Sequence, residues 1–184
     1  MSSSPSQSSP LTNGIKSDSG VSQTTNAELP ADELKRRAEL SKRLMGAFGE
    51  VVSVLMRSEA HRHQFLADLE WLVLPAIASG QFSLMDAQSK SIGFTQPVGL
   101  VLWARVSTDV DQRLSNNLLL PLKLKPDEWT SGDILWIVEA VGAQQAMGPL
   151  LKALSEKEWK GKPVKMRARD DQGRVVVKVV GGSV

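Results

Sequence analysis

The apolar residues of this chain change their spacing part-way along the sequence, and this change limits the folds that the chain can adopt. Between Pro30 and Leu55, apolar residues recur every three or four positions with Lys and Arg on the other face, which is typical of one long amphipathic helix. The stretches 81–85, 91–94 and 98–106 are short apolar or alternating runs between turn-forming residues, which predicts three consecutive strands. Helical and strand periods in one chain indicate helices packed on a sheet.

The remaining elements follow from the same reasoning. We expect a helix over 62–74 that Pro75 perturbs, a short helix over 108–114, a buried strand over 134–141, a helix over 143–159, and a hairpin over 164–180 with its turn at 170–173. The order is two helices, three strands, a short helix, a strand, a helix and two strands. It favours an α/β (α+β) class, with one mixed sheet flanked by helices.

Composition divides the 184 residues into two parts. Residues 1–27 are rich in Ser, Thr, Gly, Pro and Asn with few apolar side chains, so burial cannot offset the entropy of ordering them. We predict a disordered tail over 1–27 and a single domain over 28–184.

Residue counts exclude several classes of function. The chain has no cysteine and two histidines, which rules out disulfides and thiolate catalysis and leaves little for a metal site. No apolar run approaches the roughly 20 residues of a membrane span, and the N-terminus lacks the order of a signal peptide. We expect a cytoplasmic protein without stable membrane insertion. A net charge of +2 is too small to argue for nucleic-acid binding.

The two histidines, His61 and His63, stand at the junction of two helical patterns, in SEAHRHQF. Histidines two apart on a helix point to different sides, so a shared metal is not expected. Either imidazole could act as a base, because it titrates near neutral pH. The alternative is a solvated or hydrogen-bonded residue at a helix end.

Two further residues could take part in chemistry with a histidine. Asp133 follows the turn Thr130–Ser131–Gly132 and precedes an apolar strand, where a carboxylate can orient an imidazole. The turn amides could instead be its partners. Ser58, three residues before His61, fits a helix cap equally well.

Positive charge is concentrated near the C-terminus, where residues 152–178 hold nine Lys or Arg against four Asp or Glu. Lys165, Arg167 and Arg169 alternate with apolar residues and therefore share one face of a strand. This face could bind an acidic partner, or it could be an ordinary solvated face. We assign the five tryptophans to the core or its edge.

Four segments, SEAHRH, LPAIASGQF, PVGLVLWARVS and DEWTSGDILWI, together resemble the family of acyltransferases that activate RTX toxins. The resemblance covers residues 58–140. It implies a fold similar to that of Gcn5-type N-acetyltransferases, and transfer of a fatty-acyl chain from acyl-acyl carrier protein to internal lysines of an RTX protoxin, with no other cofactor. Carried over by position, His61 and Asp133 match the catalytic residues and Ser58 a functionally sensitive serine. The chain departs from the family in lacking tyrosine and in having Leu72 where some members have asparagine.

The resemblance implies a mechanism in which His61 accepts a proton from the lysine amine and Asp133 fixes the tautomer of His61. Backbone amides near Trp103 or over 131–133 are candidate donors to the oxyanion. Direct transfer and an acyl-histidine intermediate both stay open. Lys165, Arg167 and Arg169 are expected to contact the acyl carrier protein, and the long first helix could form a homodimer.

Two rival functions remain at this stage. One is a coenzyme A-dependent N-acetyltransferase, although QQAMGP lacks the second glycine of a pyrophosphate loop. The other is a toxin chaperone or adaptor in which His61 and Asp133 are only structural.

Overall fold

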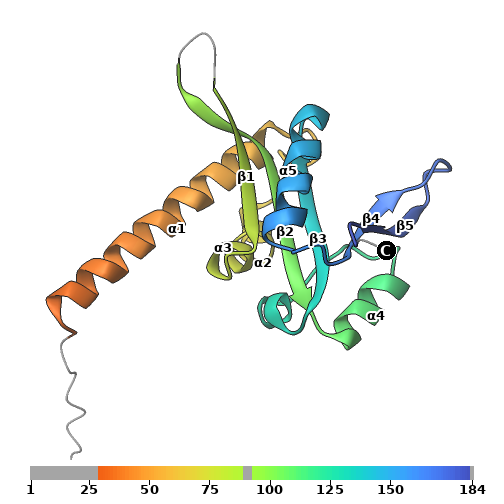
Figure 1. Ribbon diagram of the computed structural model, residues 1–184, viewed down its shortest axis with the longest axis horizontal. Helices are drawn as coiled ribbons and strands as arrows, with labels where there is room; N and C mark the ends of the chain where they lie inside the picture. Colours follow the sequence, from red (N-terminus) through yellow and green to blue (C-terminus); the bar gives the residue numbers. More distant parts are fainter. Residues whose placement is uncertain (1–28, 89–92, 183–184) are drawn as a thin grey trace, which may run out of the picture.

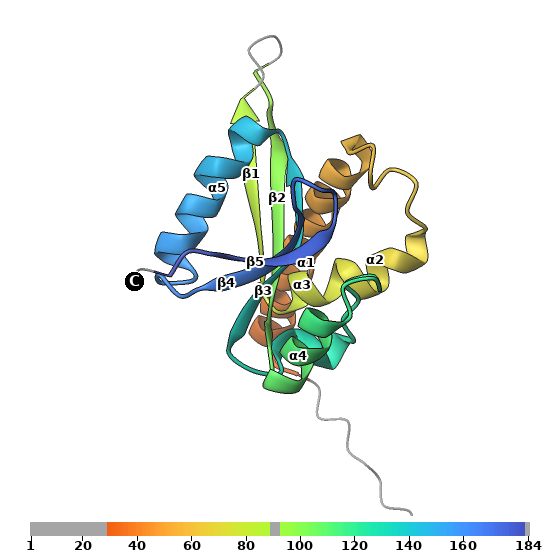
Figure 2. The same cartoon turned by 90° about the vertical axis from the view of Figure 1, so that its right-hand side faces the viewer.

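A five-stranded mixed sheet runs through the molecule, with helices on both faces (Figures 1 and 2). The computed structural model describes residues 29–88 and 93–182. The strands lie side by side in sequence order: β1 (Phe82–Gln88), β2 (Thr95–Val106), β3 (Ile134–Gly142), β4 (Val164–Arg169) and β5 (Val175–Val180). Neighbouring strands are antiparallel except β3 and β4, which are parallel. The predicted mixed sheet is confirmed.

The helices cover the sheet unequally. They are α1 (Ala31–Arg57), α2 (Leu66–Leu72), α3 (Leu74–Ala78), α4 (Thr108–Asn116), the 3-10 helix η1 (Pro126–Thr130) and α5 (Gln144–Lys157). Helices α1 to α4 share one hydrophobic cluster with Leu100, Leu102 and Trp136, whereas α5 packs on the opposite face against Val101 and Trp103. Strands β2 and β3 are thus buried on both faces, which explains their nearly continuous apolar sequences.

Two sequence predictions need correction, and a third lies outside the described residues. The region 81–106 forms two strands instead of three: the predicted strand 91–94 lies partly outside the described residues, and Gly93 and Phe94 precede β2. The helix predicted over 62–74 starts at Leu66 and is interrupted at Val73, just before Pro75, and η1 was not predicted. The segment 1–27, predicted to be disordered, lies outside the described residues.

Helix α1 confirms the long amphipathic helix. Only its C-terminal half contributes fully buried residues, namely Val51, Val54 and Leu55. Its first turns extend beyond the sheet (Figure 1), and Leu34 and Leu40 are more than half exposed there. In the part of the chain that the structure describes, neither α1 nor any other helix is long and apolar enough to cross a bilayer.

A β-bulge in β3 decides which way the middle of that strand faces. Trp103 of β2 pairs with Ile137, but the preceding residue, Leu102, pairs with Glu139, so the register skips Val138. Regular alternation would place Glu139 on the same face as Ile137, which packs under α5. The extra residue instead places Glu139 on the face of Leu102, under α1.

The pairing between β3 and β4 is short. It spans three residue pairs, from Leu135 and Val164 to Ile137 and Met166. Beyond Ile137 the two strands separate, and Figure 1 shows the β4–β5 hairpin turning away from β3. The second half of β3, which contains Glu139, therefore has no partner in β4.

Candidate active site

A tight turn after α1 brings His61 back against the helix end. Ser58 ends α1 in an extended conformation, and its carbonyl accepts hydrogen bonds from the amides of His61 (3.0 Å) and Arg62 (2.9 Å). The turn closes when the amide of Gln64 donates to the carbonyl of His61 at 2.9 Å. These backbone hydrogen bonds therefore fix the position of His61 relative to Ser58, three residues earlier in the chain.

Both imidazole nitrogens of His61 have partners. Nδ1 lies 2.8 Å from the hydroxyl oxygen of Ser58, and Nε2 lies 3.0 Å from Oε2 of Glu139. An ionised carboxylate only accepts hydrogen bonds, so Nε2 carries the proton shared with Glu139. In the neutral imidazole, Nδ1 then accepts from the Ser58 hydroxyl. Ser58, His61 and Glu139 form a continuous chain of side-chain hydrogen bonds.

Glu139 is held in place from two sides. Its Oε1 accepts a hydrogen bond from the amide of Ala140 at 3.0 Å, while its Oε2 faces His61. The hydrogen bond from Glu139 raises the pKa of His61 above its ordinary value, against the opposing effect of desolvation. The side chain of His61 is 13 % exposed, so solvent screens this pair less than a surface pair. The arrangement stabilises the imidazolium form that follows proton uptake.

A cavity of about 380 Å³ opens next to Ser58. Its apolar lining includes Val54, Val98 and Val141. Arg57 lies at its edge, where its guanidinium donates to the side chain of Gln96 (3.1 Å) and to the carbonyl of Pro97. This cavity, which we call the Ser58 pocket, can take an aliphatic chain beside the basic nitrogen of His61.

Asp133, predicted to orient His61, lies elsewhere. It stands just before the first residue of β3, whereas Glu139 lies in the second half of the strand. Six residues of extended strand separate the two by about 20 Å. Asp133 borders a different cavity with Arg105 and Glu158. The structure does not bring Asp133 to His61, because the turn places it at the far end of β3.

The turn over 131–133, predicted as one source of oxyanion donors, is also at that far end. The amide of Gly132 donates to the carbonyl of Arg105 at 3.1 Å, and the amide of Trp103 donates to Gln81 at 3.1 Å. Both amides are used within the fold. The predicted position of the oxyanion donors is therefore wrong for these two amides.

The basic face predicted on β4 is largely occupied by contacts within the chain. Lys165 forms an ion pair with Asp111 of α4 (2.7 Å), whose Oδ1 also accepts from the indole of Trp136 (2.7 Å). Arg167 donates to the backbone carbonyls of Leu114, Asn117 and Leu120, and Arg169 donates to the carbonyl of Gly173. The face is shared as predicted, but packing of α4 on it converts Lys165 into a structural residue.

Other predictions concern residues outside the catalytic chain. His63 is exposed, and four of the five tryptophans are buried, which confirms their assignment to the core: Trp103, Trp129, Trp136 and Trp159. No cluster of three or more metal-ligating side chains occurs among residues 29–88 and 93–182.

Comparison with known proteins gives consistent matches over this region. A model of the RTX toxin acyltransferase family matches residues 41–181. The RTX-I toxin-activating lysine-acyltransferase ApxIC of Actinobacillus pleuropneumoniae is 32% identical over 102 residues, which cover 54% of each chain. The leukotoxin-activating lysine-acyltransferase LktC of Pasteurella haemolytica-like sp. (strain 5943B) is 26% identical over 117 residues, 64% of this chain and 66% of the relative. The chain thus spans between half and two thirds of the length of these relatives.

Proposed function

Because the chain belongs to the RTX toxin acyltransferase family, we propose that it transfers a fatty-acyl group from a thioester donor to lysine side chains of an RTX protoxin. The two relatives are named as toxin-activating lysine-acyltransferases, which supports this choice of reaction and substrate. The observation that carries the proposal is the hydrogen-bonded chain Ser58–His61–Glu139 beside the Ser58 pocket.

In this mechanism the lysine amine attacks the thioester carbonyl, a carbon–nitrogen bond forms, and the carbon–sulfur bond breaks to release the donor as a thiolate, which takes its proton from the imidazolium of His61. The amine must lose a proton, and Nδ1 of His61 is the base that receives it. Ser58 lines the pocket, and its hydroxyl lies 2.8 Å from Nδ1, so it can take the proton of the amine as it gives its own proton to Nδ1. Glu139 stabilises the imidazolium that results, as a carboxylate does in a triad.

The second half of β3 is the candidate source of donors for the developing oxyanion. Beyond Ile137 the strand is no longer paired with β4, so amides there that make no other hydrogen bond could donate to a carbonyl oxygen. The amide of Ala140 is not one of them, because it donates to Glu139. The diverging parallel pair β3–β4 also supports the Gcn5-type fold that the resemblance implies. Direct transfer requires only the base and these donors, and we prefer it to an acyl-histidine, since both nitrogens of His61 already have partners.

We propose acyl-acyl carrier protein as the donor, with no further cofactor, and the cytoplasm as the place of reaction. The aliphatic chain would enter the Ser58 pocket, whose three valines provide apolar contact. A homodimer through the exposed first turns of α1 is compatible with this scheme.

The test is intact-mass spectrometry of the cognate protoxin after incubation with the protein and long-chain acyl-acyl carrier protein. A mass gain of one or more fatty-acyl groups, mapped to lysine and abolished by His61→Ala, is the expected result. His63→Ala is the matched control, since His63 stands two residues further on and is exposed. Full activity of His61→Ala would remove His61 from the mechanism, and no mass gain with wild-type protein would refute the proposed reaction.

A further inference from the structure

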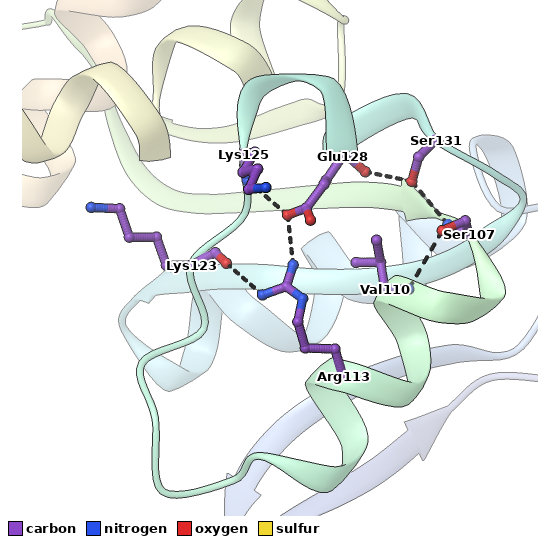
Figure 3. A network of polar contacts seen from close by, with 7 residues as sticks. All are labelled: Ser107, Val110, Arg113, Lys123, Lys125, Glu128 and Ser131. Atoms are coloured by element: carbon purple, nitrogen blue, oxygen red, sulfur yellow. Dashed lines mark hydrogen bonds and ion pairs between the residues drawn. The ribbon is translucent and has the colours of Figure 1, made fainter.

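A second hollow lies on the same face of the sheet as His61, formed by α4, the loop that follows it, and β4. It has a volume of about 290 Å³. Arg113, Lys123 and Arg167 line it, together with the apolar Leu114, Leu120 and Pro121. The Lys123 side chain points away from Arg113 (Figure 3), toward the Trp71 ring. We call it the Arg167 pocket.

Arg167 carries a positive charge that lacks a counter-ion. Its guanidinium donates to the carbonyls of Leu120 (2.6 Å) and Leu114 (2.7 Å), which fix its position without neutralising it. Its Nε is buried without a hydrogen-bond partner. Within the described part of the chain, no carboxylate forms an ion pair with it. Burial and the charge of Arg113 lower its pKa, as expected for a cation in an unfavourable environment.

The neighbouring charges do not compensate for Arg167. Arg113 forms an ion pair with Glu128 at 2.6 Å, which accounts for one positive charge (Figure 3). Lys123 lies with Nζ 5.1 Å from the centre of the Trp71 ring, a cation–π contact that leaves its charge uncompensated. Three cations against one carboxylate leave an excess of positive charge around the pocket. A partly buried cation without a counter-ion costs free energy that a bound anion would recover.

We propose that the Arg167 pocket binds the phosphate at the head of the donor's pantetheine arm; this inference rests on the proposed thioester-dependent acyl transfer. In a pantetheine arm the phosphate is attached next to a carbon that bears two methyl groups. A pocket for it needs positive charge beside a small apolar wall. Arg167 beside Leu114, Leu120 and Pro121 provides both, and Lys123 adds positive charge at the edge of the pocket.

The position of the pocket relative to the catalytic chain agrees with this assignment. Arg167 follows Met166, the last residue of β4 paired with β3, and its strand partner Val177 packs into the cluster under α1. Ile137 is the β3 partner of Met166. Glu139 lies two residues beyond Ile137, and it is on the same face of the sheet as Arg167. The pocket and the catalytic chain thus lie on one face of the sheet, near the point where the pairing of β3 and β4 ends. An extended arm held by its phosphate at Arg167 can run along this face with its thioester directed to His61.

The experiment is isothermal titration calorimetry of the full chain with 4′-phosphopantetheine, pantetheine and inorganic phosphate. We expect 4′-phosphopantetheine to bind at least about tenfold more tightly than pantetheine, because charged hydrogen bonds to phosphate are strong. Lys123→Gln should weaken 4′-phosphopantetheine binding about fivefold and leave pantetheine binding unchanged. Lys125→Gln is the matched control, since Lys125 lies two residues away outside the pocket. Arg167→Lys, with thermal unfolding as the check of fold, is the second variant.

The source of the phosphate is separated by repeating the titration with holo-acyl carrier protein and with coenzyme A. Weakening of carrier-protein binding by Lys123→Gln assigns the arm to a carrier protein, whereas weakening for coenzyme A alone assigns it to that cofactor. The assignment fails if 4′-phosphopantetheine binds no better than pantetheine, if inorganic phosphate binds as tightly as 4′-phosphopantetheine, or if both variants bind like the wild type. Because binding is measured without turnover, failure here is distinct from failure of wild-type protein to acylate the protoxin.

Discussion

Nε2 of His61 and Oε2 of Glu139 lie 3.0 Å apart, although His61 belongs to the turn after α1 and Glu139 to the second half of β3. The β-bulge at Val138 makes this contact possible, since it places Glu139 under α1. With the Ser58 hydroxyl on the other nitrogen, the pair fixes the tautomer of His61 and raises its pKa. These features define a base that is stabilised once it has taken up a proton.

Replacement of Glu139 by Gln is expected to change both the rate and its pH dependence. His61 accepts a proton only when neutral, so the rate rises as pH increases through its raised pKa. The amide removes the main cause of that raised pKa and leaves desolvation, which acts in the opposite direction. The acid limb of the pH–kcat/KM profile should therefore move to lower pH, while the plateau falls by about 10²-fold. An unchanged limb with an unchanged plateau would show that Glu139 does not act on His61.

Asp133→Asn is expected to leave acyl transfer within about twofold of the wild-type rate, because surface changes remote from a site have small effects. The side chain is exposed and stands at the opposite end of β3 from Glu139. The measurement is kcat/KM for protoxin acylation, assayed beside Glu139→Gln. A loss from Asp133→Asn comparable with that of Glu139→Gln would restore Asp133 to a functional role.

The architecture followed from the sequence because it depends on local patterns. The period of apolar residues located α1, β3, α5 and the β4–β5 hairpin, and the resemblance carried by SEAHRH led to His61. The error over 81–106 came from a long hairpin whose two strands read as three runs. Such patterns report which face of an element is buried, and they serve well where that face is regular.

Glu139 could not be found in this way. It stands within the apolar run ILWIVEAV, where regular alternation assigns it to the face under α5. Its orientation depends on a bulge set by pairing with β2, a non-local property. One signal was available: a single carboxylate inside a buried strand needs a partner. Asp133 was predicted instead of Glu139 because it immediately precedes a strand. An ordinary turn residue occupies such a position equally well.

Asp111→Ala should destabilise the fold, because Asp111 joins three elements. Its carboxylate accepts hydrogen bonds from the ammonium of Lys165 and from the indole N–H of Trp136, and residue Asp111 is 9 % exposed. Removing it leaves both groups without this partner, and we expect a loss of about 2–3 kcal/mol, below the range for fully buried pairs because Lys165 is 31% exposed. Urea denaturation measures the effect, with Asp109→Ala, an exposed residue of the same helix turn, as the control. Equal stability of the two variants would show that the ion pair does not hold β4 to α4.

The His61–Glu139 pair also predicts how the stability of the fold depends on pH. The folded-state pKa of His61 is raised above its unfolded value of about 6.5, so the folded state binds the proton more tightly than the unfolded state. The stabilising contribution is therefore fully present below the unfolded pKa and is lost as pH rises through the folded pKa. The free energy of unfolding, from urea titrations near pH 5.5 and 8.5, should differ between wild type and His61→Ala by more at the lower pH. His63→Ala, which replaces an exposed histidine in the same turn, is the matched control. A difference between wild type and His61→Ala that is equal at the two pH values would mean that Glu139 does not stabilise the imidazolium in the folded protein.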